Sequence, residues 1–543
     1  MSIHDPASRL LIIGLDGGTW DIFGPLCDLG EMPNLARLRE QGAWGILHST
    51  QPPFTAPAWM SFLTGVNPGR HGILGFWHKP ADPAASLRNE GRLVSAADLA
   101  LPTVWDYCQA AGRKVGIINV PLTYPLRPLD GFAVAGMLTP PGATDWTYPP
   151  ELRDELKDYI IELEGPQLAA EPSELLTTIT HMTERQGFHT LRLMQSRPWD
   201  VLMIVFTGTD RLFHYFWHYL RPGADVRDLN LTVSAQLSAY FHLLDSIIGS
   251  LVRSAGHLAH VIVMSDHGFG PAARHWVHLN NWLLASGLLH LRGGGGSWLH
   301  RLRQKAPWLR DVARRILPIE VREAVRRQGH LADAVDWEHT LAWAEPLYNN
   351  VAGIYLHRAD RFAEGAVSPA AVEGLRRRLM AAALELTIPS TGTRLVQDIR
   401  PREAVYNGPH VAAFPDLILT LHPDYAAVPT LGTSLITPIP RLIRTGDHRP
   451  EGLFLVWGPQ VRPGLLTETV HILDLPPTLL HLLDLPIPTA MEGRVITTAL
   501  QEGYLVVHPP RYGPTLPPPP RPHDLTPAET ATLAAQLRGL GYL

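Results

Sequence analysis

Three aspartates in this sequence closely follow apolar runs that have the length of buried strands. They are Asp16 after Leu10–Leu15, Asp210 after Val201–Phe206, and Asp266 after His260–Met264. A single aspartate in such a place is most often a turn or cap residue. Three of them, two with a histidine close by, favour a common function as ligands of divalent metal ions.

Histidines stand at ligand spacing beside these aspartates. In a helix that begins near Asp210, Asp210 and His214 lie one turn apart on one face and can reach one cation. Asp266 and His267 are consecutive, so in a loop they can serve one metal or two. His448 lies on a predicted loop, and a lone histidine is more often structural or exposed. Because the chain has 26 His and only two Cys, thiolate clusters and disulfide frameworks are excluded.

Thr55 is a candidate nucleophile. The segment around Thr55 and Pro57 has the pattern of a loop that feeds a helix, with Thr55 near the helix start. The alternative is an ordinary capping threonine. As a nucleophile, its alkoxide would be favoured by the positive end of the helix and by a metal ion.

Strand and helix patterns alternate along the chain and must position these residues. The expected parallel strands are Leu10–Leu15, Val115–Val120, Val201–Phe206, His260–Met264, Asp416–Leu421 and Gly452–Trp457, and expected helices include Pro33–Gln41, Leu229–Arg253 and Ala370–Leu386. This alternation predicts a layered α/β fold with a mostly parallel sheet. In such folds the ligand site lies beyond the carboxyl ends of the strands, where the three aspartates stand.

Six ordered motifs resemble those of the alkaline phosphatase superfamily, in the branch of type I phosphodiesterases and nucleotide pyrophosphatases. They are Asp16-Gly17-Gly18, Thr55-x-Pro57, Thr64-Gly65-x-x-Pro68-x-x-His71-Gly72, Asp210-x-x-x-His214, Ser265-Asp266-His267-Gly268, and His448. The resemblance runs from about residue 9 to residue 497 and implies a three-layer fold with a helical insertion. It also implies two divalent ions, zinc or else manganese: one held by Asp210, His214 and His448, the other by Asp16, Asp266 and His267, with Thr55 as nucleophile touching the second.

The resemblance implies hydrolysis of phosphoric esters, most of all phosphodiester or pyrophosphate bonds, through a covalent phospho- or nucleotidyl-threonine. One metal would lower the pKa of Thr55 and the other would neutralise the leaving oxygen. The resemblance does not imply sulfatase activity, because sulfatases of this superfamily need Cys or Ser at the nucleophile position and Thr55 stands there. Phe76 stands where the branch carries an Asn that binds a phosphoryl oxygen, and the small residue often seen before His214 is missing.

Other activities stay open at this point. A phosphomonoesterase or phosphotransferase would use the same centre, and a binding protein that keeps the fold would not use it at all. A mutase fits less well, because that branch uses Ser and a large inserted domain. The expected substrate is a small phosphorylated molecule, since a net charge of −5 gives no bulk attraction for a nucleic acid polymer.

The sequence predicts one catalytic domain over residues 1–505, a Pro-rich connector over 506–525 and a docking helix over 526–543. Thr526, Pro527 and Glu529 have the pattern of a capped helix start. A helical lid is expected over 292–345, where residues 298–328 hold nine basic and three acidic residues. That stretch could pack on the core or meet anionic lipid; the lipid contact is not favoured. With no targeting or membrane-spanning run, a cytoplasmic protein is expected.

Overall fold

The computed structural model describes residues 9–164, 167, 170–220, 230–292, 331–440, 442–540 and 542. The chain divides into two compact units. Unit 1 comprises Met1–Phe76, Leu93–Pro271 and Ile443–Leu543, and unit 2 comprises Trp77–Arg92 and Ala272–Leu442. No helix among the described residues combines the length and apolar character that a membrane crossing requires.

Unit 1 is built on one large sheet with strand order β20-β2-β19-β9-β1-β8-β5-β6-β7, and β21 also pairs with β2. Its strands are β1 (Leu10–Leu15), β2 (Ala43–His48), β5 (Val115–Val120), β6 (Gly131–Ala135), β7 (Thr147–Tyr148), β8 (Val201–Phe206), β9 (His260–Met264), β19 (Glu451–Trp457), β20 (Gly464–Leu465) and β21 (Val470–His471). The central strands β9, β1, β8, β5 and β6 are parallel, which confirms the predicted sheet.

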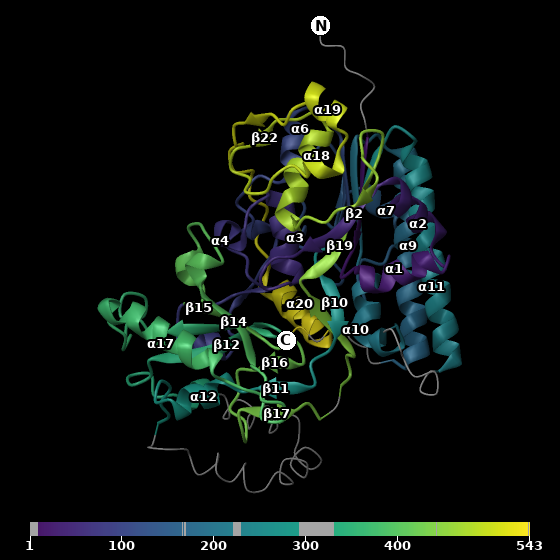
Figure 1. Ribbon diagram of the computed structural model, residues 1–543. Helices are drawn as coiled ribbons and strands as arrows, with labels where there is room; N and C mark the ends of the chain where they lie inside the picture. Colours follow the sequence, from purple (N-terminus) through teal and green to yellow (C-terminus); the bar gives the residue numbers. More distant parts are fainter. Residues whose placement is uncertain are drawn as a thin grey trace. The chain divides into compact units, whose positions relative to one another are not determined.

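Helices cover both faces of this sheet, as Figure 1 shows. One layer contains α1 (Trp20–Asp28), α2 (Pro33–Gln41), α9 (Pro172–Ser196) and α11 (Leu231–Ala255), and the other contains α3 (Thr55–Thr64), α6 (Val104–Ala110) and α18 (Leu475–Leu482). Every residue of β1, β8 and β9 is buried, because these strands are covered on two faces. Their continuous apolar runs follow from this two-sided burial.

Two predicted parallel strands are antiparallel. β19 pairs antiparallel with both β2 and β9 in the main sheet. The predicted strand Asp416–Leu421 is β15 (Leu417–Leu421), which lies in a separate antiparallel sheet of unit 2. A continuous apolar run reports burial on two faces, and it carries no information about strand direction or sheet membership.

Unit 2 contains the antiparallel sheet β12-β13-β15-β14. Its other strands are β12 (Ala342–Tyr348), β13 (Val351–Leu356) and β14 (Val396–Pro401), and α17 (Val372–Leu384) packs beside β14. Trp343 and Tyr355 stack in its core with ring centroids 5.2 Å apart. The predicted lid over 292–345 lies mostly outside the described residues. Of its described part, Leu331–Ala334 forms α16 and Ala342 begins β12.

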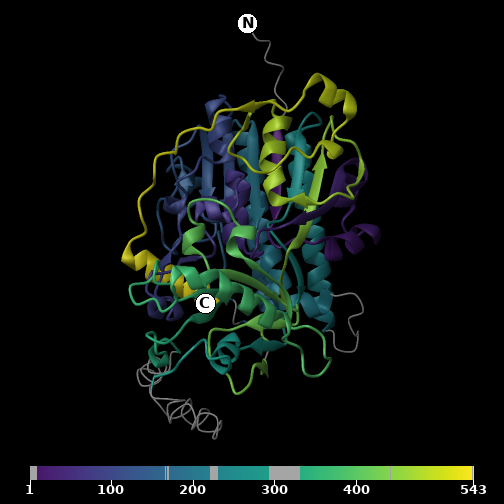
Figure 2. The same cartoon turned by 60° about the vertical axis from the view of Figure 1, so that its left-hand side comes forward.

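The last helix of unit 1, α20 (Pro527–Gly539), begins as predicted, with Thr526 as N-cap and a capping box to Glu529. Leu533, Leu537 and Leu540 are buried. Figure 2 shows the long extended segment, in yellow, that leads along the edge of unit 1 to α20. The helix therefore packs against unit 1 through a row of leucines one turn apart.

Candidate metal centre

The parallel register places the predicted site residues at one edge of the main sheet. β1 pairs with β8 and β9 in register, so the carboxyl ends of these three strands coincide. Asp16 follows β1, Asp210 lies in the first turn of α10 (Gly208–Leu220) after β8, and Asp266 follows β9. His448 reaches the same place on β18 (Gly446–Arg449), which pairs antiparallel with β10 (Gly268–Pro271).

Thr55 is the first residue of α3, and its neighbours along the chain contact both sides of this site. The carbonyl of Pro53 lies 3.2 Å from His448 Nδ1. One turn into the helix, Trp59 Nε1 donates to Asp16 Oδ2 at 3.3 Å. These contacts fix the start of α3 against the site at two points.

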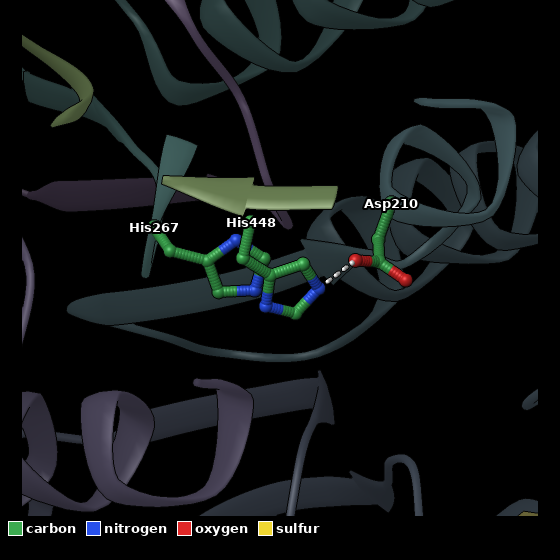
Figure 3. A group of neighbouring side chains, drawn as sticks. All are labelled: Asp210, His267 and His448. Carbon is green, nitrogen blue, oxygen red and sulfur yellow. Dashed lines mark ion pairs between the residues drawn. The ribbon is translucent and has the colours of Figure 1, made fainter. Parts of the chain in front are cut away.

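Asp210, His214 and His448 converge on one point. Asp210 Oδ1 lies 3.4 Å from His214 Nε2 and 3.2 Å from His448 Nε2, and the two Nε2 atoms lie 3.1 Å apart. Figure 3 shows the His448 ring facing this carboxylate. The Nδ1 atoms lie near backbone carbonyls, His214 at 3.0 Å from Gly446 and His448 at 3.2 Å from Pro53. Nδ1–H donation to these carbonyls would leave each Nε2 lone pair free for a metal.

Asp16, Asp266 and His267 form a second group. His267 Nε2 lies 3.6 Å from Asp16 Oδ1 and 3.3 Å from Asp266 Oδ2. Protein donors hold the other carboxylate oxygens: Gly17 N donates to Asp266 Oδ1 at 3.1 Å, and Trp59 donates to Asp16 Oδ2. Gly17 has φ +70°, and a Cβ there would lie 2.5 Å from Phe269, so this turn requires glycine. The His267 and His448 rings stack at 3.5 Å, so the two groups adjoin.

Five buried polar atoms in this region have no hydrogen-bond partner within the described part of the chain. They are Thr55 Oγ1, Asp16 Oδ1, Asp210 Oδ1, Asp266 Oδ2 and His267 Nε2. Buried polar groups are nearly always hydrogen-bonded, because leaving one unpaired costs about 1–3 kcal/mol. The oxygen and imidazole donors on both groups fit divalent cations, so the residues present suit the metals that the sequence predicts.

Burial controls the protonation of these ligands. It raises the pKa of Asp266 to about 8 and that of Asp16 well above its usual range, with repulsion from the neighbouring carboxylates adding to the effect. Burial lowers the pKa of His214 and His267, so both imidazoles are neutral at pH 7. Burial alone would also raise the pKa of Asp210, but the positive charge of the adjacent Arg211 guanidinium outweighs it and holds the pKa of Asp210 well below the usual range. Neutral imidazoles and crowded carboxylates are the states that a cation stabilises.

Sequence reasoning missed four residues around this centre. Asp447 adjoins His448 and forms a further potential ligand group with His448 and His214. Arg211 makes a buried ion pair with Glu162 at 2.8 Å and contacts Asp210. Tyr542 hydrogen-bonds Asp210. Of these, only Asp447 had a local signal, its place next to a candidate ligand.

Phe76, which stands where the related branch has Asn, lies in an aromatic contact. Its ring is 4.7 Å from that of Phe54 and 5.3 Å from that of Tyr542. Two cationic groups, Arg211 and Arg444, approach the Tyr542 ring, with guanidinium carbons 5.5 and 4.9 Å from it. The position of Phe76 is therefore apolar, and the guanidinium groups contact the Tyr542 ring that packs against it.

Two solved structures share the fold over most of the chain. Phosphonoacetate hydrolase from Sinorhizobium meliloti 1021, in complex with phosphonoacetate, is 16% identical with a TM-score of 0.53, covering 87% of this chain and 94% of its own. An inactive variant of murine ectonucleotide pyrophosphatase / phosphodiesterase 5, in complex with AMP, is 14% identical with a TM-score of 0.50, covering 91% and 100%. At these identities the likeness shows the fold alone, which is alkaline-phosphatase-like.

A search of curated proteins found no match. The sequence profile of the type I phosphodiesterase / nucleotide pyrophosphatase family, which is metal-dependent, matches residues 10–434. This match includes Asp16, Thr55, Asp210 and Asp266 and ends before His448. The chain belongs to the type I phosphodiesterase / nucleotide pyrophosphatase family and is a hydrolase of the alkaline phosphatase superfamily.

Proposed function

We propose that this protein hydrolyses phosphodiester or pyrophosphate bonds of small phosphorylated molecules, with Thr55 as nucleophile beside a centre of two divalent ions. The observation that supports this most is the buried convergence of two groups of potential metal ligands beside the start of α3. Within the described part of the chain, several of their oxygen and nitrogen atoms and Thr55 Oγ1 have no hydrogen-bond partner. A structural cluster would have satisfied these atoms internally.

In this proposal Asp210, His214 and His448 hold one ion, and Asp16, Asp266 and His267 hold the other. His and Asp ligands without Cys suit zinc, and manganese is the second candidate. When bound, such ions supply positive charge that stabilises an alkoxide and a developing negative charge on phosphate oxygens. Asp447 forms a further potential ligand group with His214 and His448.

Thr55 carries the covalent step. Its Oγ1 attacks phosphorus, forming an O–P bond as the bond to the leaving oxygen breaks, and a water molecule then hydrolyses the phosphothreonine ester and restores the hydroxyl. Thr55 starts the ten-residue helix α3, so the positive end of that helix favours both the alkoxide and the anionic substrate. The burial of Thr55, 1% exposed, limits competing water.

The substrate class follows from charge and from the relatives. Burial lowers the pKa of His214, and the positive charge of Arg444 lowers it further. A cationic group therefore lies beside the proposed site. Such a group attracts phosphate or phosphonate anions. The solved relatives bind phosphonoacetate and AMP, which supports a small phosphorylated substrate.

The test is hydrolysis of bis-p-nitrophenyl phosphate and p-nitrophenyl phosphate with added zinc or manganese. We expect the diester to be the better substrate, and Thr55→Ala to lower its turnover by at least about a thousandfold while two metals stay bound. Thr232→Ala is the matched control, because Thr232 lies in the first turn of α11 and is exposed. Substantial turnover by Thr55→Ala would refute the nucleophile. A wild-type protein that binds no metal and hydrolyses neither ester would refute the whole proposal.

A further inference from the structure

Tyr542 lies more than 300 residues from Asp210 in the sequence but contacts it directly. Its hydroxyl lies 3.0 Å from Asp210 Oδ2, and Arg211 Nη1 donates to the same hydroxyl at 2.8 Å. Because a guanidinium can only donate, the hydroxyl oxygen accepts from Arg211, and its hydrogen is free for Asp210 Oδ2. The direction of this hydrogen bond is thus fixed by the neighbouring arginine.

The segment that carries Tyr542 is held firmly in unit 1. The Tyr542 backbone N–H donates to the Leu537 carbonyl at 2.9 Å, and Arg444 donates to the carbonyl of Leu540. On α20, Gln536 Nε2 donates to the carbonyl of Leu163 at 3.3 Å. Leu163 follows Glu162, the ion-pair partner of Arg211, so α20 contacts the network from two directions.

The Tyr542 ring is packed on several sides. It contacts Phe54, Phe76 and His214, with centroids 5.8, 5.3 and 6.1 Å away, and the guanidinium groups of Arg211 and Arg444 approach it. Aromatic and cation–π contacts of this kind favour particular ring geometries and so orient the ring. The ring therefore directs the hydroxyl toward one oxygen of one carboxylate.

We propose that Tyr542 is a positioning residue for the metal ligand Asp210, completing its hydrogen bonding from the far end of the sequence; this rests on the proposed function. Arg211 and Tyr542 both donate to Asp210 Oδ2. The other oxygen, Oδ1, is the one that faces His214 and His448. With Oδ2 held, Asp210 presents a single oxygen to the ion, in a fixed orientation.

The affinity for the ion at Asp210 should therefore depend on the Tyr542 hydroxyl, although this hydroxyl is not a metal ligand. Partners that orient a metal ligand change metal affinity by about 10- to 100-fold when removed. Tyr542→Phe removes the hydrogen bond and keeps the ring with its aromatic contacts. We therefore expect the zinc dissociation constant of one of the two sites to rise by about tenfold or more, and that of the other to stay unchanged.

The experiment measures zinc binding to metal-free protein by competition with a chromogenic chelator, for the wild type and for Tyr542→Phe. Tyr512→Phe is the control, since Tyr512 is 65% exposed and also loses a single hydroxyl. Thermal unfolding of the metal-free proteins checks that the variants fold alike. A second variant, Tyr542→Ala, removes the ring as well and should weaken the same site at least as much.

The outcomes separate this inference from the proposed function. A wild type that binds two zinc ions, with one site weakened only in the Tyr542 variants, supports the inference. Equal dissociation constants in wild type and Tyr542→Phe overturn it and leave the two-metal centre intact. Faster turnover in Tyr542→Ala with unchanged zinc affinity also overturns it, because the tyrosine then acts as a cover over the site. If the wild type binds no zinc, the proposed function itself fails.

Discussion

Two clusters of buried charge, one in each unit, are satisfied in opposite ways. In unit 2, Asp416 is fully buried, and Arg358 and Arg376 each approach its Oδ1 at 3.1 Å. Arg402 lies 3.6 Å from the same oxygen, and the Leu356 N–H donates to Oδ2 at 3.0 Å. We call these residues the Asp416 cluster. In unit 1, the proposed metal ligands Asp16, Asp210 and Asp266 each keep one oxygen without a hydrogen-bond partner among the described residues.

The difference separates a structural use of buried charge from a functional one. A buried carboxylate that is paired and hydrogen-bonded inside the protein holds its neighbours in place. Carboxylates that are buried together repel one another, and the raised pKa of Asp266 and of Asp16 reflects burial together with that repulsion. Such a cluster lowers the stability of the folded protein, and cations that bind to it would offset the repulsion.

The largest expected effect comes from Asp266→Asn. This change removes a proposed ligand, so diester hydrolysis should fall by at least about a thousandfold and one metal should be lost. The metal-free protein should unfold at nearly the wild-type temperature, because a carboxyl with a pKa of about 8 is already mostly protonated at pH 7. Elemental analysis and calorimetry check both points. If the free energy of unfolding of the metal-free variant were several kcal/mol below that of the metal-free wild type, Asp266 would stabilise the fold as Asp416 does, and the two clusters would not differ.

The same change in the other cluster should act on stability alone. Asp416→Asn leaves Arg358, Arg376 and Arg402 without their shared buried anion, and breaking a buried ion pair in this way costs about 3–5 kcal/mol. We expect unit 2 to unfold earlier in urea, with metal content unchanged. Asp360→Asn is the control, because Asp360 pairs with Arg358 at a more exposed position. A wild-type midpoint for Asp416→Asn would show that other acceptors, such as Glu403 and Asp360, are enough to satisfy these arginines.

Removing the metals should affect unit 1 and leave unit 2 unchanged. An ion that binds only the folded state stabilises it by about 2.7 kcal/mol at a hundredfold excess over its dissociation constant and about 4.1 at a thousandfold. Chelation should therefore speed amide hydrogen exchange in β1, β8 and β9 by about a hundredfold or more, and leave β13 and β15 unchanged. Exchange measured by mass spectrometry reads both regions in one sample. Equal acceleration in the two sheets would contradict the assignment of the metals to unit 1.

Sequence patterns were sufficient for the elements that carry the centre. The bounds of β1, β5, β8 and β9 agree with the predicted runs, because strands buried on both faces leave uninterrupted apolar residues between polar ends. The order of aspartates after these strands then placed Asp16, Asp210 and Asp266 at one sheet edge. His448 depended on the resemblance, since nothing in its local sequence separates it from a structural histidine. The metal roles of all six ligands remain predictions.

The parts that could not be predicted depend on contacts across long stretches of chain. Tyr542 and Asp210 are 332 residues apart, and a tyrosine after a capped helix has no pattern that indicates its partner. Arg211 looked like an ordinary helix residue, although it is paired with Glu162 and 1% exposed. The direction of β19 and the sheet of β15 were predicted wrongly, because residue pattern reports burial and tertiary packing decides pairing.

The smallest effect we predict concerns His260, a buried imidazole at the start of β9, the strand whose other end leads to Asp266. Burial lowers its pKa to about 4, whereas the unfolded chain keeps the ordinary value of about 6.5. The unfolded state therefore binds the proton more tightly, and the protein loses stability as the pH falls from about 6.5 toward 4, by about 2 kcal/mol at pH 5. His260→Gln should remove this part of the acid sensitivity. Comparing metal-free wild type and variant in urea at pH 7 and pH 5 isolates His260, because the ligands of the metal centre are common to both proteins. Equal losses in the two proteins would mean that His260 keeps an ordinary pKa in the fold.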